Sequence, residues 1–135
     1  MILRIEKGSA VPISSQIAQQ ISMLCASGRL QPGERMPSVR ELARELAVNQ
    51  NTVLRVYERL VRDQLLEMRQ GQGTFVAANA ASTGLAVHRE SLVEELRQLA
   101  RQGLALGLES KQLHELMDKA LEQLQSPASV EKEAS

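Results

Sequence analysis

The sequence has almost no aromatic side chains. Among 135 residues there is one Tyr, one Phe and no Trp. A protein that holds single-stranded nucleic acid by stacking needs several aromatic faces, so the composition argues against that class. The core must instead be built from aliphatic side chains. This favours helices packed through Leu, Ile, Val and Ala.

Cysteine and long apolar runs are also scarce. Cys25 is the only cysteine, which rules out an intrachain disulfide, and its apolar helical surroundings predict a small buried hydrophobe. No apolar run approaches the ~18 residues that a membrane span requires, and the N-terminus lacks the apolar region of a secretion signal. We therefore expect a cytoplasmic protein with no membrane partner.

Patterns of catalytic or metal-binding residues are missing as well. The two histidines and the single cysteine are too far apart in sequence for the usual metal-ligand spacing. The carboxylate pair at 94–95 has no accompanying nucleophile or pocket motif. Gly71 and Gly73 lack the lysine and the strand–loop–helix context of a phosphate-binding loop. We expect no enzymatic activity, no metal and no cofactor.

The net charge is zero, but the two halves of the chain differ in sign. Residues 1–77 contain ten Arg or Lys against seven Asp or Glu, whereas residues 78–135 contain six against nine. A basic first half indicates that this half meets a polyanion. A surplus this small also arises by chance, so charge alone leaves both interpretations open.

Apolar residues recur every three or four positions in three segments of the first half, which predicts helices over about 12–28, 38–46 and 49–61. Ser38 and Glu41 match a capping box, and Asn49 is a good N-cap. The gap of about three residues between the second and third helices forces a sharp corner.

Two short strands, 65–68 and 74–77, follow the third helix and flank a Gln-Gly-Gln-Gly tip. Glycine at these positions suits a tight hairpin that needs positive φ. Three helices and a hairpin in this order predict a winged helix–turn–helix domain over residues 1–77. The fold class is mainly α, with the hairpin as a small β wing.

The second half is predicted to hold a linker, two helices and a tail. Residues 77–84 are small and polar, so we predict a linker at 78–87. Residues 88–125 carry two amphipathic helices, and 126–135 resemble a disordered tail. Two Leu-rich stripes cannot bury both faces alone, so we expect them to form the dimerisation element of a homodimer. The predicted dimerisation residues are Leu92, Leu96, Leu99, Leu113, Leu116, Met117, Leu121 and Leu124.

The predicted third helix has a polar outer face. The residues that point away from its buried stripe are Gln50, Asn51, Leu54, Arg55 and Glu58. The two amides can match an adenine edge, the guanidinium a guanine or a phosphate, and the leucine a thymine methyl group. Thr52 suits a phosphate contact, since the N-terminal end of a recognition helix lies nearest the DNA.

Some of these residues also suit roles that involve no DNA. Asn49, Asn51 and Thr52 could simply cap a helix, and we assign Asn49 to that role. A winged helix can also dock a protein. Arg40, Arg55 and Arg69 favour DNA, because protein docking has no need for arginines placed around the recognition face.

Residues 12–76 resemble the DNA-binding domain of the GntR family of bacterial transcription regulators. The resemblance rests on "SGRLQPGERMPSVRELA" (27–43), "VNQNTVLRVYERL" (48–60) and "GQGTFV" (71–76). It implies that the Pro-Ser-x-Arg segment at the start of the second helix, the start of the third helix and the wing tip contact double-stranded DNA. The predicted DNA-binding residues are Ser38, Arg40, Gln50, Asn51, Thr52, Leu54, Arg55, Arg69, Gln70, Gly71, Gln72 and Gly73.

The chain also departs from many members of the family. Those members carry arginines where Gln50 and Leu54 stand here, so their operator sequence cannot be transferred. The pattern "VNxNTVxRxY" and the short second half resemble the YtrA-type subgroup. That resemblance implies a homodimeric repressor of a nearby transporter operon that binds a palindromic operator. DNA binding would associate it with the nucleoid. The sequence leaves the existence and the identity of a small-molecule effector open.

Overall fold

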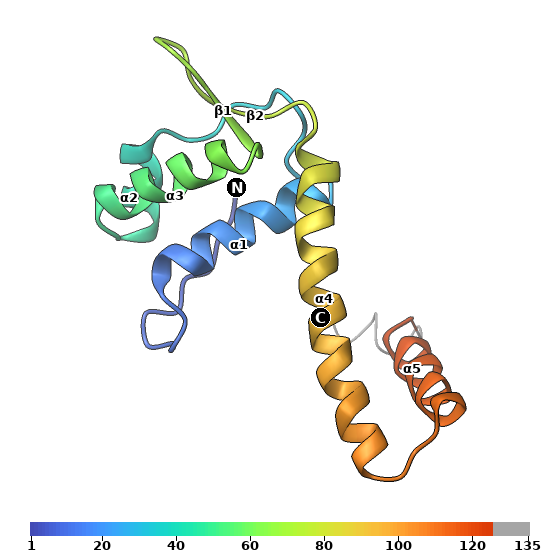
Figure 1. Ribbon diagram of the computed structural model, residues 1–135. Helices are drawn as coiled ribbons and strands as arrows, with labels where there is room; N and C mark the ends of the chain where they lie inside the picture. Colours follow the sequence, from blue (N-terminus) through green and yellow to red (C-terminus); the bar gives the residue numbers. More distant parts are fainter. Residues whose placement is uncertain (126–135) are drawn as a thin grey trace. The chain divides into compact units, whose positions relative to one another are not determined.

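The computed structural model describes residues 1–125, and the predicted tail at 126–135 lies outside them. The chain divides into two compact units, which meet between Glu90 and Ser91. The first unit contains α1 (Ile13–Ala26), α2 (Val39–Leu46), α3 (Gln50–Arg62), β1 (Leu66–Arg69) and β2 (Gly73–Val76) (Figure 1). The long helix α4 (Ala80–Ala105) begins in the first unit and continues into the second, which also holds α5 (Ser110–Gln125).

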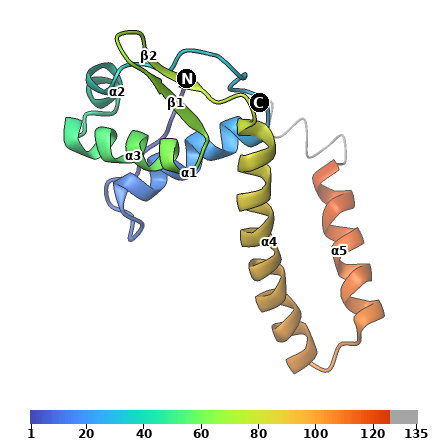
Figure 2. The same ribbon diagram turned by 45° about the horizontal axis from the view of Figure 1, so that its top comes forward.

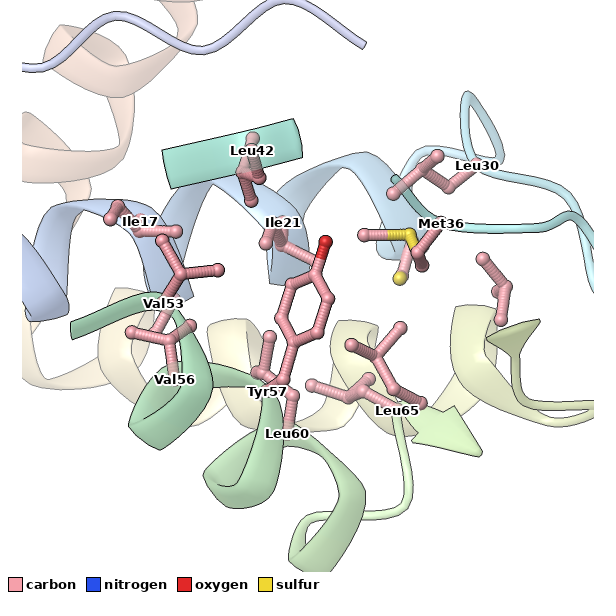
Figure 3. Close-up of a cluster of buried hydrophobic side chains, with 14 of the residues drawn as sticks. Ile17, Ile21, Leu30, Met36, Leu42, Val53, Val56, Tyr57, Leu60 and Leu65 are labelled. Carbon is pink, nitrogen blue, oxygen red and sulfur yellow. The ribbon is translucent and has the colours of Figure 1, made fainter. Parts of the chain in front are cut away.

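The core of the first unit is aliphatic and surrounds a single phenol (Figure 3). Tyr57 is fully buried, and its hydroxyl donates a hydrogen bond of 2.7 Å to the Pro37 carbonyl. Burial raises the pKa of Tyr57 well above its usual value, and the charges of Glu41 and Glu45 raise it further. Cys25 is buried as the sequence predicts, and burial likewise raises the pKa of its thiol.

Both predicted N-caps are present, Ser38 at the start of α2 and Asn49 at the start of α3. The N–H of Glu41 donates to the Ser38 hydroxyl oxygen at 3.0 Å, and the N–H of Asn51 donates to the Asn49 side-chain oxygen at 2.8 Å. Ala47 ends α2 in the left-handed region, at φ 55°. Because this conformation cannot continue a right-handed helix, the chain turns sharply into α3.

The N-terminal arm is held by side chains in place of a strand ladder. The side-chain amide of Gln20 bonds both the N–H and the carbonyl of Arg4, at 2.9 and 2.6 Å. Gln16 does the same for Glu6, at 2.8 and 2.9 Å. Further along the arm, Lys7 Nζ donates to the Ala47 carbonyl at 2.8 Å and so ties the arm to the corner.

The hairpin pairs Leu66 with Val76 and Arg69 with Gly73, which places β1 one residue later and β2 one residue earlier than predicted. Residues 33–36 lie along the free edge of β2. The N–H groups of Gly33 and Met36 donate to β2 carbonyls at 2.8 Å each. The prediction missed this pairing, because the two prolines and the glycine around it are typical of loops.

Residues 78–87 are mostly helical, so the prediction of a non-helical linker is wrong. Ala80 begins α4 and is buried, and Gly84 lies against α1. A Cβ at Gly84 would come within 3.0 Å of the Ser22 carbonyl oxygen. Small residues here permit close packing of the two helices. A run of small residues is also typical of a linker, so composition alone does not distinguish the two. The assignment of residues 88–125 to dimerisation stays a prediction.

The second unit exposes most of its apolar side chains. Residues 106–109 connect α4 to α5, with Gly107 at φ 89°, and Leu113 lies over Gly103. Among the methionines of residues 1–125, only Met36 is buried, whereas Met23, Met68 and Met117 are exposed. Within residues 1–125, no helix has the length and apolar character needed to cross a membrane.

Replacing Tyr57 by Phe removes the hydrogen bond to Pro37 while keeping the ring. We expect the free energy of unfolding to fall by about 1 kcal/mol at neutral pH. Because the pKa of Tyr57 is raised in the folded protein, this stabilisation depends on pH. It is complete below about pH 10, which is the pKa of Tyr in the unfolded chain, and it is lost as the pH rises toward the pKa of Tyr57 in the folded protein.

Urea unfolding of the wild type and of Tyr57→Phe between pH 7 and 11 tests this expectation. Tyr57 is the only Tyr, so the difference between the two proteins isolates its titration. The gap in stability should narrow above pH 10. A gap that is constant across this range would contradict the assigned role of the phenol.

Candidate nucleic-acid interface

Helix α3 has one buried side and one exposed side. Val53, Val56, Tyr57 and Leu60 point into the core. The side chains predicted to meet DNA lie on the opposite side: Gln50, Asn51, Leu54 and Arg55 are exposed, and Thr52 is partly buried. Leu54 is 37% exposed, so its side chain is accessible to a partner. The amides, the hydroxyl and the leucine form the mixed surface that base edges require.

Two of the predicted arginines have no partner. Within the part of the chain that the structure describes, the side chains of Arg40 and Arg55 make no hydrogen bond or ion pair, and both are exposed. Their charge is therefore available to an external anion. Arg69 differs: its guanidinium lies 4.2 Å from the centre of the Phe75 ring, and its Nε lies 3.8 Å from a Glu67 oxygen. These contacts hold Arg69 along the hairpin.

The wing tip is a tight turn formed by residues 69–72. The N–H of Gln72 donates to the Arg69 carbonyl at 2.9 Å, and Gly71 has φ 77°. Gln70, Gly71 and Gln72 are all exposed. The absence of side chains at the glycines lets backbone and amides approach a groove closely.

Several cationic residues of the same unit were missed from the sequence. The Arg35 guanidinium lies beneath Gly73, close enough that a Cβ there would come within 3.3 Å of its Nε. Arg59 and Arg62 follow Arg55 along α3 at helical spacing. That spacing was visible in the sequence and could have revealed them. The position of Arg35 depends on the pairing of residues 33–36 with β2, for which the sequence carried no signal.

The predicted DNA-binding residues fall into three groups within the first unit: the start of α2, the start of α3 and the wing. Ser38 serves as a helix cap, and its O–H remains free to donate to another acceptor. No group of three or more His, Cys, Asp or Glu side chains that could hold a metal occurs among residues 1–125.

Residues 13–76 match the bacterial regulatory proteins of the gntR family. The chain is also 38% identical over 114 residues to the HTH-type transcriptional repressor YtrA of Bacillus subtilis, a match that covers 84% of this chain and 88% of that protein. The chain belongs to the GntR family. Its GntR relatives are regulators of transcription, not enzymes, and the predictions of family and function class are confirmed.

Solved structures agree with this GntR assignment. A transcriptional regulator from Oenococcus oeni has a TM-score of 0.73 at 25% identity, over 86% of this chain and 99% of that one. The DNA-binding domain of AraR, solved with its operator ORX1, has a TM-score of 0.52 at 28% identity, over 57% of this chain and 99% of that one. The winged helix–turn–helix fold predicted for this GntR regulator is thus confirmed.

Gly73 is a sensitive position in the wing of this GntR regulator. Its φ of 123° strains any other residue, and an added Cβ would displace Arg35. We expect Gly73→Ala to lower the free energy of unfolding by about 1–2 kcal/mol, measured by urea denaturation. Gly8→Ala is the matched control, because a Cβ at Gly8 meets nothing within 4 Å. Equal stability of the two variants would contradict the assigned strain.

Proposed function

We propose that the chain is a homodimeric repressor that binds a palindromic operator in double-stranded DNA. The observation that carries this proposal is the outer face of α3, where amides, a hydroxyl and an exposed arginine stand together at the start of the helix. The chain would work in the cytoplasm, bound to the nucleoid. The similarity to YtrA of Bacillus subtilis, a repressor by name, supports repression.

Each group of predicted residues has a role in the proposed complex. The start of α3 enters the major groove, where Gln50 and Asn51 contact base edges and Leu54 meets a thymine methyl group. Arg40 and Thr52 bind phosphates on either side and fix the orientation of the helix. The wing tip at 70–72 approaches the minor groove, and Arg69 supports it from the hairpin.

Dimerisation would cover the apolar side chains of the second unit. Leu99 is 59% exposed and Leu124 is 64% exposed, and α5 contains no buried residue. Seven of the eight predicted dimerisation residues are exposed, and the other, Leu113, is partly buried. Contiguous exposed leucines on paired helices mark an interaction surface. A second copy supplies a matching surface by two-fold symmetry.

The two-fold symmetry determines the form of the proposed operator. Two recognition helices would enter successive major grooves on one side of the DNA, so the half-site centres lie about one turn (~10 bp) apart. Control of a transporter operon belongs to the proposal through the YtrA-type resemblance alone, and the proposal names no small-molecule effector.

Fluorescence anisotropy with a labelled duplex from the gene's own upstream region tests DNA binding, with a scrambled duplex as reference. Asn51→Ala should weaken binding to the upstream duplex by about tenfold or more, because one base contact is lost. Arg40→Ala should weaken binding to both duplexes alike, because it removes a phosphate contact.

Arg89→Ala is the matched control, since Arg89 is exposed and lies outside the predicted surface. It should bind as the wild type does. If the wild type binds neither duplex even at low salt, the repressor proposal fails in favour of a winged helix that docks a protein.

Sedimentation equilibrium tests the dimer. The double variant Leu99→Asp with Leu121→Asp places charge in the proposed interface and should convert a dimer to a monomer. Gln98→Asp adds one such charge at a neighbouring exposed position and should leave the dimer intact. A monomeric wild type would contradict the proposal, and so would a double variant that stays dimeric.

A further inference from the structure

A cleft of about 650 Å³ lies between the first turn of α1 and the exposed side of α3. The two helices pack against each other in both views of the ribbon (Figures 1 and 2). The polar groups that line the cleft include the Ser14 hydroxyl from α1 and, from α3, Asn51, Thr52, Arg55, Arg59 and Arg62. Every one of these side chains can donate a hydrogen bond.

The charge of the cleft has one sign. Three guanidinium groups line it, and no carboxylate does. Arg55 and Arg62 have no ion-pair partner among residues 1–125. Arg59 Nε lies 3.9 Å from an Asp63 oxygen, but both side chains are about half exposed. An exposed pair at this distance is weak, so Arg59 can turn toward a stronger anion.

The arginines form a row and not a single point. Positions 55, 59 and 62 lie on one side of α3, and Arg55 and Arg62 are about 10 Å apart along the helix axis. A strand of B-DNA presents one phosphate per 3.4 Å of helix rise, so the row spans several phosphates. A single small anion would occupy only part of it.

We propose that this cleft binds the sugar–phosphate backbone of the DNA strand that borders the bases read by α3. Arg59, Arg62 and Ser14 are then phosphate contacts in addition to the residues predicted from the sequence. The inference rests on the proposed placement of α3 in the major groove. Asn51 and Thr52 line the cleft and also stand at the start of the reading face, so one bound strand would reach both.

The test compares the salt dependence of DNA binding in matched variants. Arg59→Gln and Arg62→Gln each remove one charge and keep good helix formers. Arg59→Lys keeps the charge, and Arg89→Gln removes a charge outside the cleft. Anisotropy is measured with the upstream duplex and its scrambled counterpart over a series of NaCl concentrations. Circular dichroism melting confirms that each variant is folded.

For each Gln variant, we expect the magnitude of the slope of log K against log salt to fall by about 0.9, the effect of one lost phosphate contact. The fall should be equal on both duplexes, so the ratio of their affinities stays unchanged. Arg59→Lys and Arg89→Gln should keep the wild-type slope. Ser14→Ala should weaken binding to both duplexes equally without changing the slope.

Wild-type slopes in both Gln variants would overturn the inference while leaving the repressor proposal intact. An inorganic phosphate titration at constant ionic strength identifies the alternative ligand. If phosphate saturably stabilises the wild type but not Arg59→Gln, and the slopes are unchanged, the cleft is a site for a free anion. A wild type that binds neither duplex overturns both proposals.

Discussion

The hydrogen bond from Tyr57 to Pro37 links the two helices on which the reading surface depends. Tyr57 belongs to α3, and the Pro37 carbonyl immediately precedes the cap of α2. The bond therefore fixes the start of α2 against the middle of α3 from inside the core. Aliphatic side chains can fill that space, but they cannot select one orientation as a directional bond does. Arg40 and Asn51 are presented together as a result.

The N-terminal arm holds the solvent side of the corner between α2 and α3. Gln16 and Gln20 bond the arm's backbone along α1, and Lys7 reaches the carbonyl of Ala47. The pair of helices is thus restrained by a phenol within the core and by an ammonium group at the exposed corner. Such restraint before binding reduces the conformational entropy that is lost when a helix is placed in a groove.

Local signals in the sequence were sufficient for the helices and the hairpin. The roles of the two helix caps and of the turn glycine depend only on residues two or three positions away. The sequence therefore predicts these roles correctly for Ser38, Asn49 and Gly71. Long-range packing escaped prediction. Gly84 belongs to a helix because α1 lies against it, and Arg35 reaches the wing because residues 33–36 pair with β2. The later arginines of α3 were missed because base contacts are expected only from the first turns of a recognition helix.

Two residues with left-handed backbones bracket α3: Ala47 precedes it at φ 55°, and Gln64 follows it at φ 64°. Neither conformation can extend a right-handed helix, so the length of the segment between them is fixed. An inserted or deleted residue would rotate everything beyond it by about 100° and turn the outer face toward the core. The chain can therefore change the DNA sequence that it recognises by substitution within α3, but it cannot do so by changing the length of the helix.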